Sequence, residues 1–146
     1  MASVSVLFIC LGNICRSPMA EAIFRQQVSD AGLGADIGID SAGTGDWHVG
    51  NPPHRGTLTV LRQNGIDGSE LLARQLQPID LDAFDYLIVM DDSNQSDVEY
   101  LARRNSGADS AIIARLLDYA DPSVTQDELE VPDPYFGGGF DHVYRL

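Results

Sequence analysis

Both cysteines of this chain lie in one short stretch that also carries an arginine and a serine. The stretch FICLGNICRSP spans Phe8–Pro18 and places Cys10 directly after an apolar run. Cys15, Arg16 and Ser17 follow a short loop. A thiolate can act as a nucleophile, and a guanidinium can form two parallel hydrogen bonds with an oxyanion. These side chains therefore suit attack by Cys10 on a bound oxyanion.

The residues on either side of the loop predict a strand before it and a helix after it. SVSVLFIC is apolar and rich in β-branched residues, which is typical of a strand buried on both faces. Ser17 has the residue type of a helix N-cap, and Pro18 suits the first helical position. Gly32 and Gly34 indicate where the helix ends. We therefore expect the two cysteines in the loop between a strand and a helix.

A loop that enters a helix N-terminus favours an anion, because its backbone N–H groups and the helix dipole supply partial positive charge. Gly12 permits close or left-handed backbone, and Asn13 tolerates the same conformation and can brace the loop with its amide. The same field favours the thiolate form of Cys10, and the Ser17 hydroxyl can donate to that sulfur. We therefore expect a phosphate dianion to bind above Cys10.

The composition limits the kinds of partner. The chain has 146 residues, 44% of them hydrophobic, which is typical of one globular domain. Its net charge of -13 repels nucleic acid and anionic membrane, so neither is an expected partner. No apolar run is long enough to span a membrane, and no basic residue precedes the first apolar stretch, so we expect a cytoplasmic location.

In a reducing compartment, two cysteines indicate catalysis, redox chemistry or metal binding more than a structural disulfide. A zinc site is disfavoured because the cysteines and the three histidines, His48, His54 and His142, lack the ligand spacing of such sites. We therefore expect neither a metal nor a cofactor.

Strand and helix patterns alternate along the rest of the chain. DIGIDSAGT and FDYLIVMDD are typical of strands, HRGTLTVLRQNG and DSNQSDVEYLARRN of helices, and AIIARLLDYA of a strand that runs into a loop. This alternation predicts an α/β fold in which helices cover both faces of a parallel sheet. An acidic, turn-rich segment over residues 118–139 predicts a long surface loop.

Several stretches together resemble the low molecular weight protein tyrosine phosphatases. They are VLFICLGNICRSPMAEAIF, SAGTGDWHVGNPPHRGT, ARQ, MDDSN and VPDPYFGGGFDHVY, and they occur in that order over nearly the whole chain. The resemblance implies one phosphatase domain over residues 1–146 with a four-stranded parallel sheet. It also implies hydrolysis of phosphotyrosine or aryl phosphates through a phosphocysteine, with inorganic phosphate as a product.

The resemblance assigns roles to particular residues. It makes Cys10 the nucleophile and Arg16 the phosphate clamp. The expected phosphate-binding residues are Leu11, Gly12, Asn13, Ile14, Cys15, Arg16 and Ser17. It also implies that Trp47 and Tyr135 form aromatic walls around a substrate phenyl ring, and we expect Trp47 to be partly exposed because its loop is rich in turn residues.

Loss of a phenolate at neutral pH requires a general acid. DPYF supplies Asp133, which Pro134 keeps out of helical geometry and which the resemblance places as that acid. An Asp-Pro pair is also a common turn, so the residues alone leave both interpretations open. Cys15, beside Arg16 on the same loop, either packs as a small apolar residue or resolves an oxidised Cys10 as a disulfide.

Two departures and two alternative functions accompany the resemblance. Many relatives have a histidine where this chain has Leu71, and the terminal helix predicted by FDHVYRL, with Phe140, Val143 and Tyr144 at helical spacing, is shorter than in relatives.

An arsenate reductase of the same fold is disfavoured because no cysteine follows Cys15. A non-catalytic phosphate-binding module is the other alternative, although Cys10 and Asp133 are both present.

Overall fold

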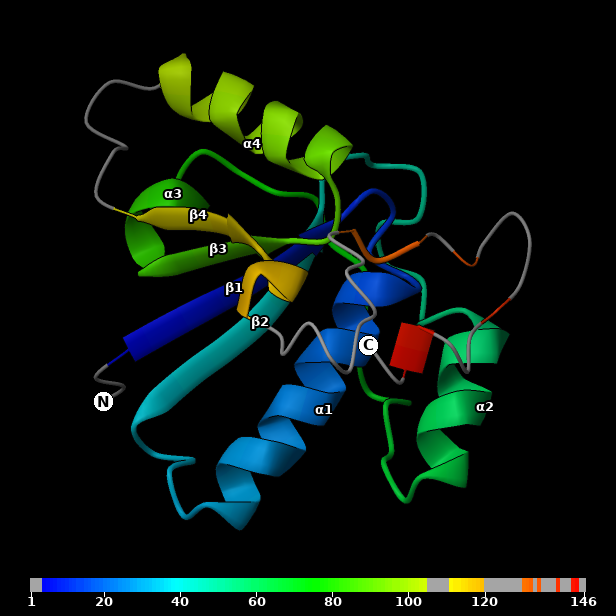
Figure 1. Cartoon of the computed structure of the whole chain (residues 1–146). Helices are drawn as coiled ribbons and strands as arrows, with labels where there is room; N and C mark the ends of the chain where they lie inside the picture. Colours follow the sequence, from blue (N-terminus) through cyan, green and yellow to red (C-terminus); the bar gives the residue numbers. More distant parts are fainter. Residues whose placement is uncertain are drawn as a thin grey trace.

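The chain folds into a sheet with helices packed against it (Figure 1). A computed structural model describes residues 4–104, 111–119, 130–132, 134, 139 and 143–144. In chain order its elements are β1 (Val4–Cys10), α1 (Arg16–Asp30), β2 (Ile37–Gly43), α2 (Arg55–Gln63), α3 (Asp80–Ala83), β3 (Tyr86–Val89), α4 (Asp92–Arg103), β4 (Ile112–Arg115) and the 3-10 helix η1 (Leu116–Tyr119).

The sheet has four parallel strands in the order β2-β1-β3-β4. β1 pairs with β2 along its whole length, from Val4 opposite Ile37 to Cys10 opposite Gly43. Figure 1 shows β1, in dark blue, between β2 and β3. The predicted α/β class with a four-stranded parallel sheet is confirmed. Because β1 and β2 end at the same level, the loops that follow them meet at one edge of the sheet, where sites of such folds form.

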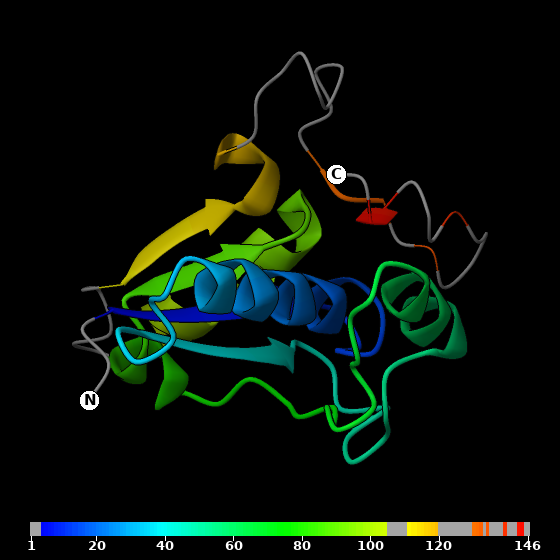
Figure 2. The ribbon, with the colours of Figure 1, turned by 90° about the horizontal axis from the view of Figure 1, so that it is seen from below.

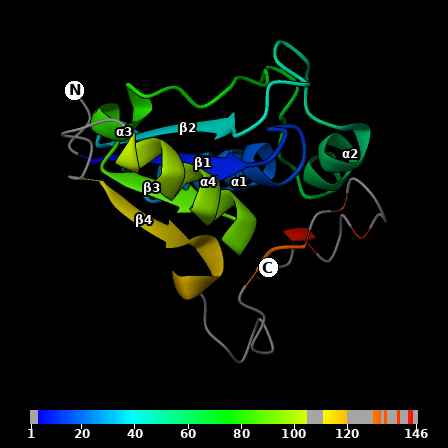
Figure 3. The same ribbon diagram turned by 90° about the horizontal axis from the view of Figure 1, so that it is seen from above.

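Alternate residues of β1 enter two apolar cores on opposite faces of the sheet. The first core joins the sheet to α1 and α2 and includes Val6, Phe8, Met19, Leu61 and Ile88. The second core joins it to α3 and α4 and includes Leu7, Ile9, Leu81, Leu87 and Val98. α1 lies in front of the sheet in Figure 2, and α4 lies in front of it in Figure 3. Burial on both faces explains the continuous apolar run of β1.

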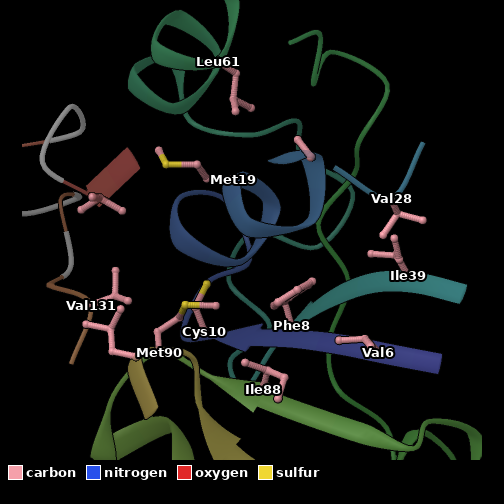
Figure 4. Close-up of a cluster of buried hydrophobic side chains, with 13 residues drawn as sticks. Val6, Phe8, Cys10, Met19, Val28, Ile39, Leu61, Ile88, Met90 and Val131 are labelled. Atoms are coloured by element: carbon pink, nitrogen blue, oxygen red, sulfur yellow. The ribbon is translucent and has the colours of Figure 1, made fainter. Parts of the chain in front are cut away.

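The first core extends to the end of β1, where the loop over residues 11–15 begins (Figure 4). Phe8 packs edge to face on Phe24 of α1, with the ring centroids 5.6 Å apart. Cys10 belongs to the same core and is only 2% exposed. Each large apolar side chain buried here stabilises the fold by about 1.5–3 kcal/mol relative to exposure. The core therefore holds the base of the loop rigidly.

The N-cap of α1 is Cys15, so the prediction of Ser17 as N-cap is wrong. Cys15 has φ of -117° and ψ of -81° and supplies no capping side chain. Ser17 lies inside the first helical turn, and its hydroxyl contacts the sulfur of Cys10 instead of a backbone N–H. The predicted helix end is confirmed, because Gly32 has φ of +75° directly after the C-cap residue Ala31.

The remaining predicted elements are present with shifted ends, and two further elements appear. Residues 112–115 form the predicted strand β4, but η1 follows it where a loop was expected. The four-residue helix α3 was not predicted from the sequence. The expected loop over residues 118–139 and the terminal helix lie mostly outside the described residues.

Candidate active site

The loop from Leu11 to Cys15 closes around the sulfur of Cys10. The backbone N–H of Asn13 donates to Cys10 Sγ over 3.2 Å. Asn13 has φ of +57°, the single positive φ among the non-glycine residues that the structure describes. Asparagine tolerates this left-handed conformation better than most residues, and it turns the following backbone around the thiol. At Gly12 the backbone is close to the His48 ring, since an added Cβ would lie 3.0 Å from its Cδ2.

The Asn13 side chain braces this loop from below with all of its polar groups. Its Nδ2 donates to Ser17 Oγ over 2.7 Å and to Ser41 Oγ over 2.9 Å. Its Oδ1 accepts from the backbone N–H of Arg74 over 2.9 Å. Because a backbone N–H can only donate, this last contact fixes which end of the amide points where. Asn13 therefore connects the loop to α1, to β2 and to the segment before α3.

The Ser17 hydroxyl contacts both Asn13 and the sulfur of Cys10. Its oxygen accepts from Asn13 and lies 3.0 Å from Cys10 Sγ. A thiolate carries no hydrogen, so with Cys10 ionised the hydrogen bond between the two residues is donated by Ser17. A hydroxyl and a backbone N–H directed at Sγ both stabilise a thiolate more than a thiol. The arrangement thus suits Cys10 as a nucleophile.

The network continues to a buried carboxylate that the sequence did not single out. Ser41 Oγ donates to Glu21 Oε1 over 2.6 Å, and Glu21 is 3% exposed. Arg25 Nε donates to Glu21 Oε2 over 2.9 Å, and Arg25 also donates to the backbone carbonyl of Ile39. Because an ionised carboxylate only accepts, Glu21 directs the Ser41 hydrogen to itself and leaves the Ser41 lone pairs for Asn13.

Arg16 is buried and ion-paired at the start of α1. Its Nη1 lies 2.6 Å from Asp91 Oδ2 and donates to the carbonyl of Val131 over 2.9 Å. Asp91 is also the N-cap of α4, where its Oδ1 accepts from the N–H of Asn94 over 2.8 Å. The pair therefore connects the loop after β1 to the loop after β3 at the carboxyl edge of the sheet.

Gly43, at the end of β2, allows the loop after β1 to lie close against the backbone of β2. A Cβ on Gly43 would lie 2.8 Å from the backbone oxygen of Leu11, so any side chain here would displace the loop. Gly43 also forms an isolated parallel bridge with Gln75. Its backbone N–H donates to the carbonyl of Arg74 over 2.8 Å. Residues 74–76 thus extend the sheet past β2 and present the Arg74 N–H to Asn13.

The Arg74 side chain secures this segment from the other side. Its Nη1 and Nη2 donate to the two oxygens of Asp80 over 2.9 Å and 3.1 Å, and its Nε donates to Asp40 over 3.1 Å. Burial lowers the pKa of the Arg74 guanidinium, but the hydrogen bonds and charges of Asp80 and Asp40 raise it, and the pKa ends above its ordinary value. Arg74 is therefore charged at every pH at which the protein folds.

Leu71, which the resemblance contrasts with a histidine, packs against the first core. It therefore contributes no hydrogen bond to the loop from its side chain. The polar support in this chain comes from the Arg74 backbone and from Glu21 with its partner Arg25.

The remaining predicted site residues are Trp47, Cys15, Asp133 and Tyr135. Trp47 is 68% exposed, as expected, and its ring covers Gly45, where an added Cβ would come 1.9 Å from the ring. Cys15 is buried at 4% exposure, and no disulfide joins it to Cys10. Asp133 and Tyr135 lie outside the described residues. Val131, two residues before Asp133, donates to the carbonyl of Met90 over 2.8 Å.

Over the described ranges, no group of three or more histidine, cysteine, aspartate or glutamate side chains is arranged to hold a metal ion. None of the helices described here combines the length and the apolar character needed to cross a membrane.

Comparison with known proteins identifies relatives of the same architecture. Low molecular weight protein-tyrosine-phosphatase YfkJ of Bacillus subtilis is 51% identical over 143 residues, which cover 98% of this chain and 88% of that protein. The low molecular weight phosphotyrosine protein phosphatase of Schizosaccharomyces pombe is 48% identical over 145 residues, which cover 97% of this chain and 88% of that protein.

Solved structures agree with these sequence relationships. The crystal structure of YfkJ has a TM-score of 0.90 at 50% identity and covers 100% of this chain and 88% of that one. The structure of DARP, a drosophila arginine phosphatase, has a TM-score of 0.84 at 36% identity and covers 95% of this chain and 87% of that one. The family model for low molecular weight phosphotyrosine protein phosphatase matches residues 5–146. With this match over nearly its whole length, the chain belongs to the low molecular weight phosphotyrosine protein phosphatase family.

Proposed function

We propose that this protein tyrosine phosphatase hydrolyses phosphotyrosine in proteins, and small aryl phosphates, through a phosphocysteine on Cys10. The observation that carries the proposal is the pair of donors aimed at one buried sulfur: the Asn13 N–H at 3.2 Å and the Ser17 hydroxyl at 3.0 Å. A thiolate held in this way at the start of a helix is a strong nucleophile beside an anion site.

In the first step, Cys10 Sγ attacks the phosphorus in line with the phenolic oxygen. The S–P bond forms as the P–O bond to the phenol breaks, and Asp133 donates a proton to the departing oxygen. Backbone N–H groups of residues 11–16 and the Arg16 guanidinium hold the equatorial oxygens as their charge changes. Support for Asp133 comes from Val131, which contacts both Arg16 and Met90 at the edge of the site.

In the second step, water attacks the phosphorus and the S–P bond breaks. Asp133 takes a proton from that water, inorganic phosphate forms, and the Cys10 thiolate is restored. The network that holds Asn13 and Ser17 stabilises the thiolate as a leaving group in this step, as it stabilises the nucleophile in the first.

We place the substrate ring between Trp47 and Tyr135. Exposure of Trp47 beside Leu11, the residue after the nucleophile, supports this placement. Such a slot favours phosphotyrosine, whose ring fills the space between the walls, over phosphoserine, whose side chain is shorter. We also propose a cytoplasmic location, which two cysteines that form no disulfide suit.

A second candidate substrate is phosphoarginine, which the likeness to DARP favours. Its scissile bond is P–N, and its leaving guanidine also needs a proton. Arsenate reduction is disfavoured because the two cysteines of the chain both lie in the loop, which leaves none to carry the oxidation away. A non-catalytic module would not require two donors aimed at a thiol.

The proposal is tested with p-nitrophenyl phosphate, phosphotyrosine and phosphoarginine peptides, on wild type and Cys10→Ser. We expect the wild type to turn over the first two in the presence of a chelator and to leave phosphoarginine largely intact. Cys10→Ser should lose turnover but bind phosphate in calorimetry. Normal turnover by Cys10→Ser would refute the cysteine mechanism, and preference for phosphoarginine would transfer the assignment to the second candidate.

We further propose that Cys15 protects Cys10 from irreversible oxidation. Peroxide converts the Cys10 thiolate to a sulfenic acid, and the Cys15 thiol then displaces water from it to form a disulfide. Only four residues, Leu11 to Ile14, separate the two cysteines along the chain, which supports their approach.

A further inference from the structure

A cavity of about 330 Å³ lies beside the nucleophile loop, on the face of the sheet that α4 covers. Leu11, Thr44 and Trp47 line one side, and Asp97, Tyr100 and Leu101 of α4 line the other. The three residues of α4 follow the spacing of a single helix face. We call this the flanking cavity. The mechanism above uses Leu11 and Trp47 of this lining and gives no role to Thr44 or to the three residues of α4.

The flanking cavity borders Leu11, the residue that follows the nucleophile in the sequence. Leu11 follows Cys10 directly, and the backbone N–H groups of Thr44 and Gly45 donate to the carbonyls of Cys10 and Leu11, each over 2.9 Å. Neighbouring residues of an extended peptide are about 3.3–3.6 Å apart along the chain. Because the cavity borders the residue after the nucleophile, we expect a residue next to the phosphotyrosine of a bound peptide to reach it.

The walls of the flanking cavity combine aromatic rings with unused polar groups. Trp47 and Tyr100 are 68% and 55% exposed. Thr44 Oγ1 is buried and is the one such side-chain atom in the described part of the chain that lacks a hydrogen-bond partner. Asp97 is exposed and forms no ion pair with any residue that the structure describes. Arg104 lies over the Tyr100 ring and donates to its hydroxyl over 2.9 Å, which fixes the ring on α4.

These features select one kind of side chain. An aliphatic stem can pack on Leu11, Leu101 and the rings, because lysine and arginine bury their stems on apolar surface. A cationic head can pair with Asp97 and stack on the exposed Trp47 ring. An acidic side chain would be repelled by Asp97, and a purely apolar one would leave Asp97 without a counter-ion.

We propose that the flanking cavity binds a lysine or arginine side chain next to the phosphotyrosine of a protein substrate, and so sets which phosphoproteins are dephosphorylated. The inference rests on the proposed phosphatase activity. The net charge of -13 on the whole chain favours basic substrate segments as well, so the test separates this local contact from the general field.

The experiment measures kcat/KM for phosphotyrosine peptides that carry arginine, leucine or glutamate at each of the two positions on either side of the phosphotyrosine. For wild type we expect arginine to exceed glutamate by about tenfold or more at one position at least, with leucine between them. Asp97→Asn should reduce this ratio to about threefold or less, and Tyr100→Ala should reduce it as well.

Glu99→Gln is the matched control, because it removes the same charge from the exposed face of the same helix outside the flanking cavity. It should keep the arginine preference, and all three variants should turn over p-nitrophenyl phosphate as wild type does. Equal loss of the preference in Glu99→Gln and Asp97→Asn, or a preference for leucine over arginine, would overturn the inference. Absence of p-nitrophenyl phosphate turnover in wild type would instead refute the proposed function.

Discussion

Ser17 Oγ lies 3.0 Å from Cys10 Sγ and accepts from the amide of Asn13 over 2.7 Å. This relationship makes a hydroxyl from inside the first turn of α1 a dedicated donor to the sulfur. The Arg74 N–H donates to Asn13 Oδ1 and so fixes the orientation of the Asn13 amide. The Asn13 Nδ2 then donates to Ser17, which leaves the Ser17 hydrogen available to the sulfur. The donors to the Cys10 sulfur are therefore positioned in part by Arg74, which lies outside the loop.

Replacement of Ser17 by alanine should slow both turnover and alkylation of Cys10. A hydrogen bond to a charged partner contributes about 1.5–3 kcal/mol, so we expect kcat to fall by about tenfold or more. Alkylation by iodoacetamide at pH 6 should slow in parallel, because less thiolate is present. Ser29→Ala, an exposed change on the same helix, is the control. Unchanged alkylation with reduced kcat would show that Ser17 acts on the bound phosphate instead.

Replacement of Arg25 by alanine should destabilise the protein and impair a site that it does not touch. Glu21 is buried, but Arg25 is half-exposed, so we expect the free energy of unfolding in urea to fall by only about 1–2 kcal/mol. A fall in kcat should accompany it, because the Ser41 hydroxyl loses its fixed direction. Arg25→Lys should restore part of both.

Gln26→Ala provides the comparison for Arg25, since Gln26 forms an exposed hydrogen bond to Asp30 at the same spacing on α1. Its free energy of unfolding should change by less than about 0.5 kcal/mol. If Arg25→Ala behaved like Gln26→Ala in both measurements, Glu21 would be held without help from Arg25.

Replacement of Asp133 by asparagine should slow release of tyrosine more than release of p-nitrophenol. The p-nitrophenolate ion is a better leaving group and needs protonation less. Single-turnover measurements on both substrates isolate this first step from hydrolysis of the phosphocysteine. Equal losses on the two substrates would remove Asp133 from the role of general acid.

Replacement of Cys15 by serine should leave initial activity near wild type but prevent recovery from oxidation. Both proteins receive the same dose of peroxide and then dithiothreitol. Wild type should regain most of its activity, because a disulfide is reducible, whereas the variant should regain little, because Cys10 proceeds to sulfinic acid. Equal recovery would leave Cys15 as a packing residue of the loop.

The sequence predicted the elements whose signals are local. The apolar run of β1 and the stop at Gly32 each depend on a few adjacent residues, so both were read correctly. The start of α1 was misplaced because Ser17 has the residue type of an N-cap but uses its hydroxyl on Cys10. The four residues of α3 are too few to show a helical period.

The support of the loop could not be read in the same way. Glu21, Ser41 and the Arg74 N–H come from three separate segments. They meet through the packing of α1 on the sheet, the register of β1 against β2, and the pairing of Gly43 with residues 74–75. The i,i+4 spacing of Glu21 and Arg25 was visible, but such pairs are usually exposed and weak. Burial, which gives this pair its importance, is a property of the packed structure.

The contact between Arg16 and Asp91 has a consequence for the end of the catalytic cycle. Arg16 carries its own counter-ion at 2.6 Å, so the cation that we propose as the phosphate clamp is partly neutralised before any substrate arrives. A phosphate dianion must share the guanidinium with Asp91, which weakens its hold in the ground state. The product then leaves more readily, and inhibition by accumulated inorganic phosphate should be modest for a site otherwise built to attract it.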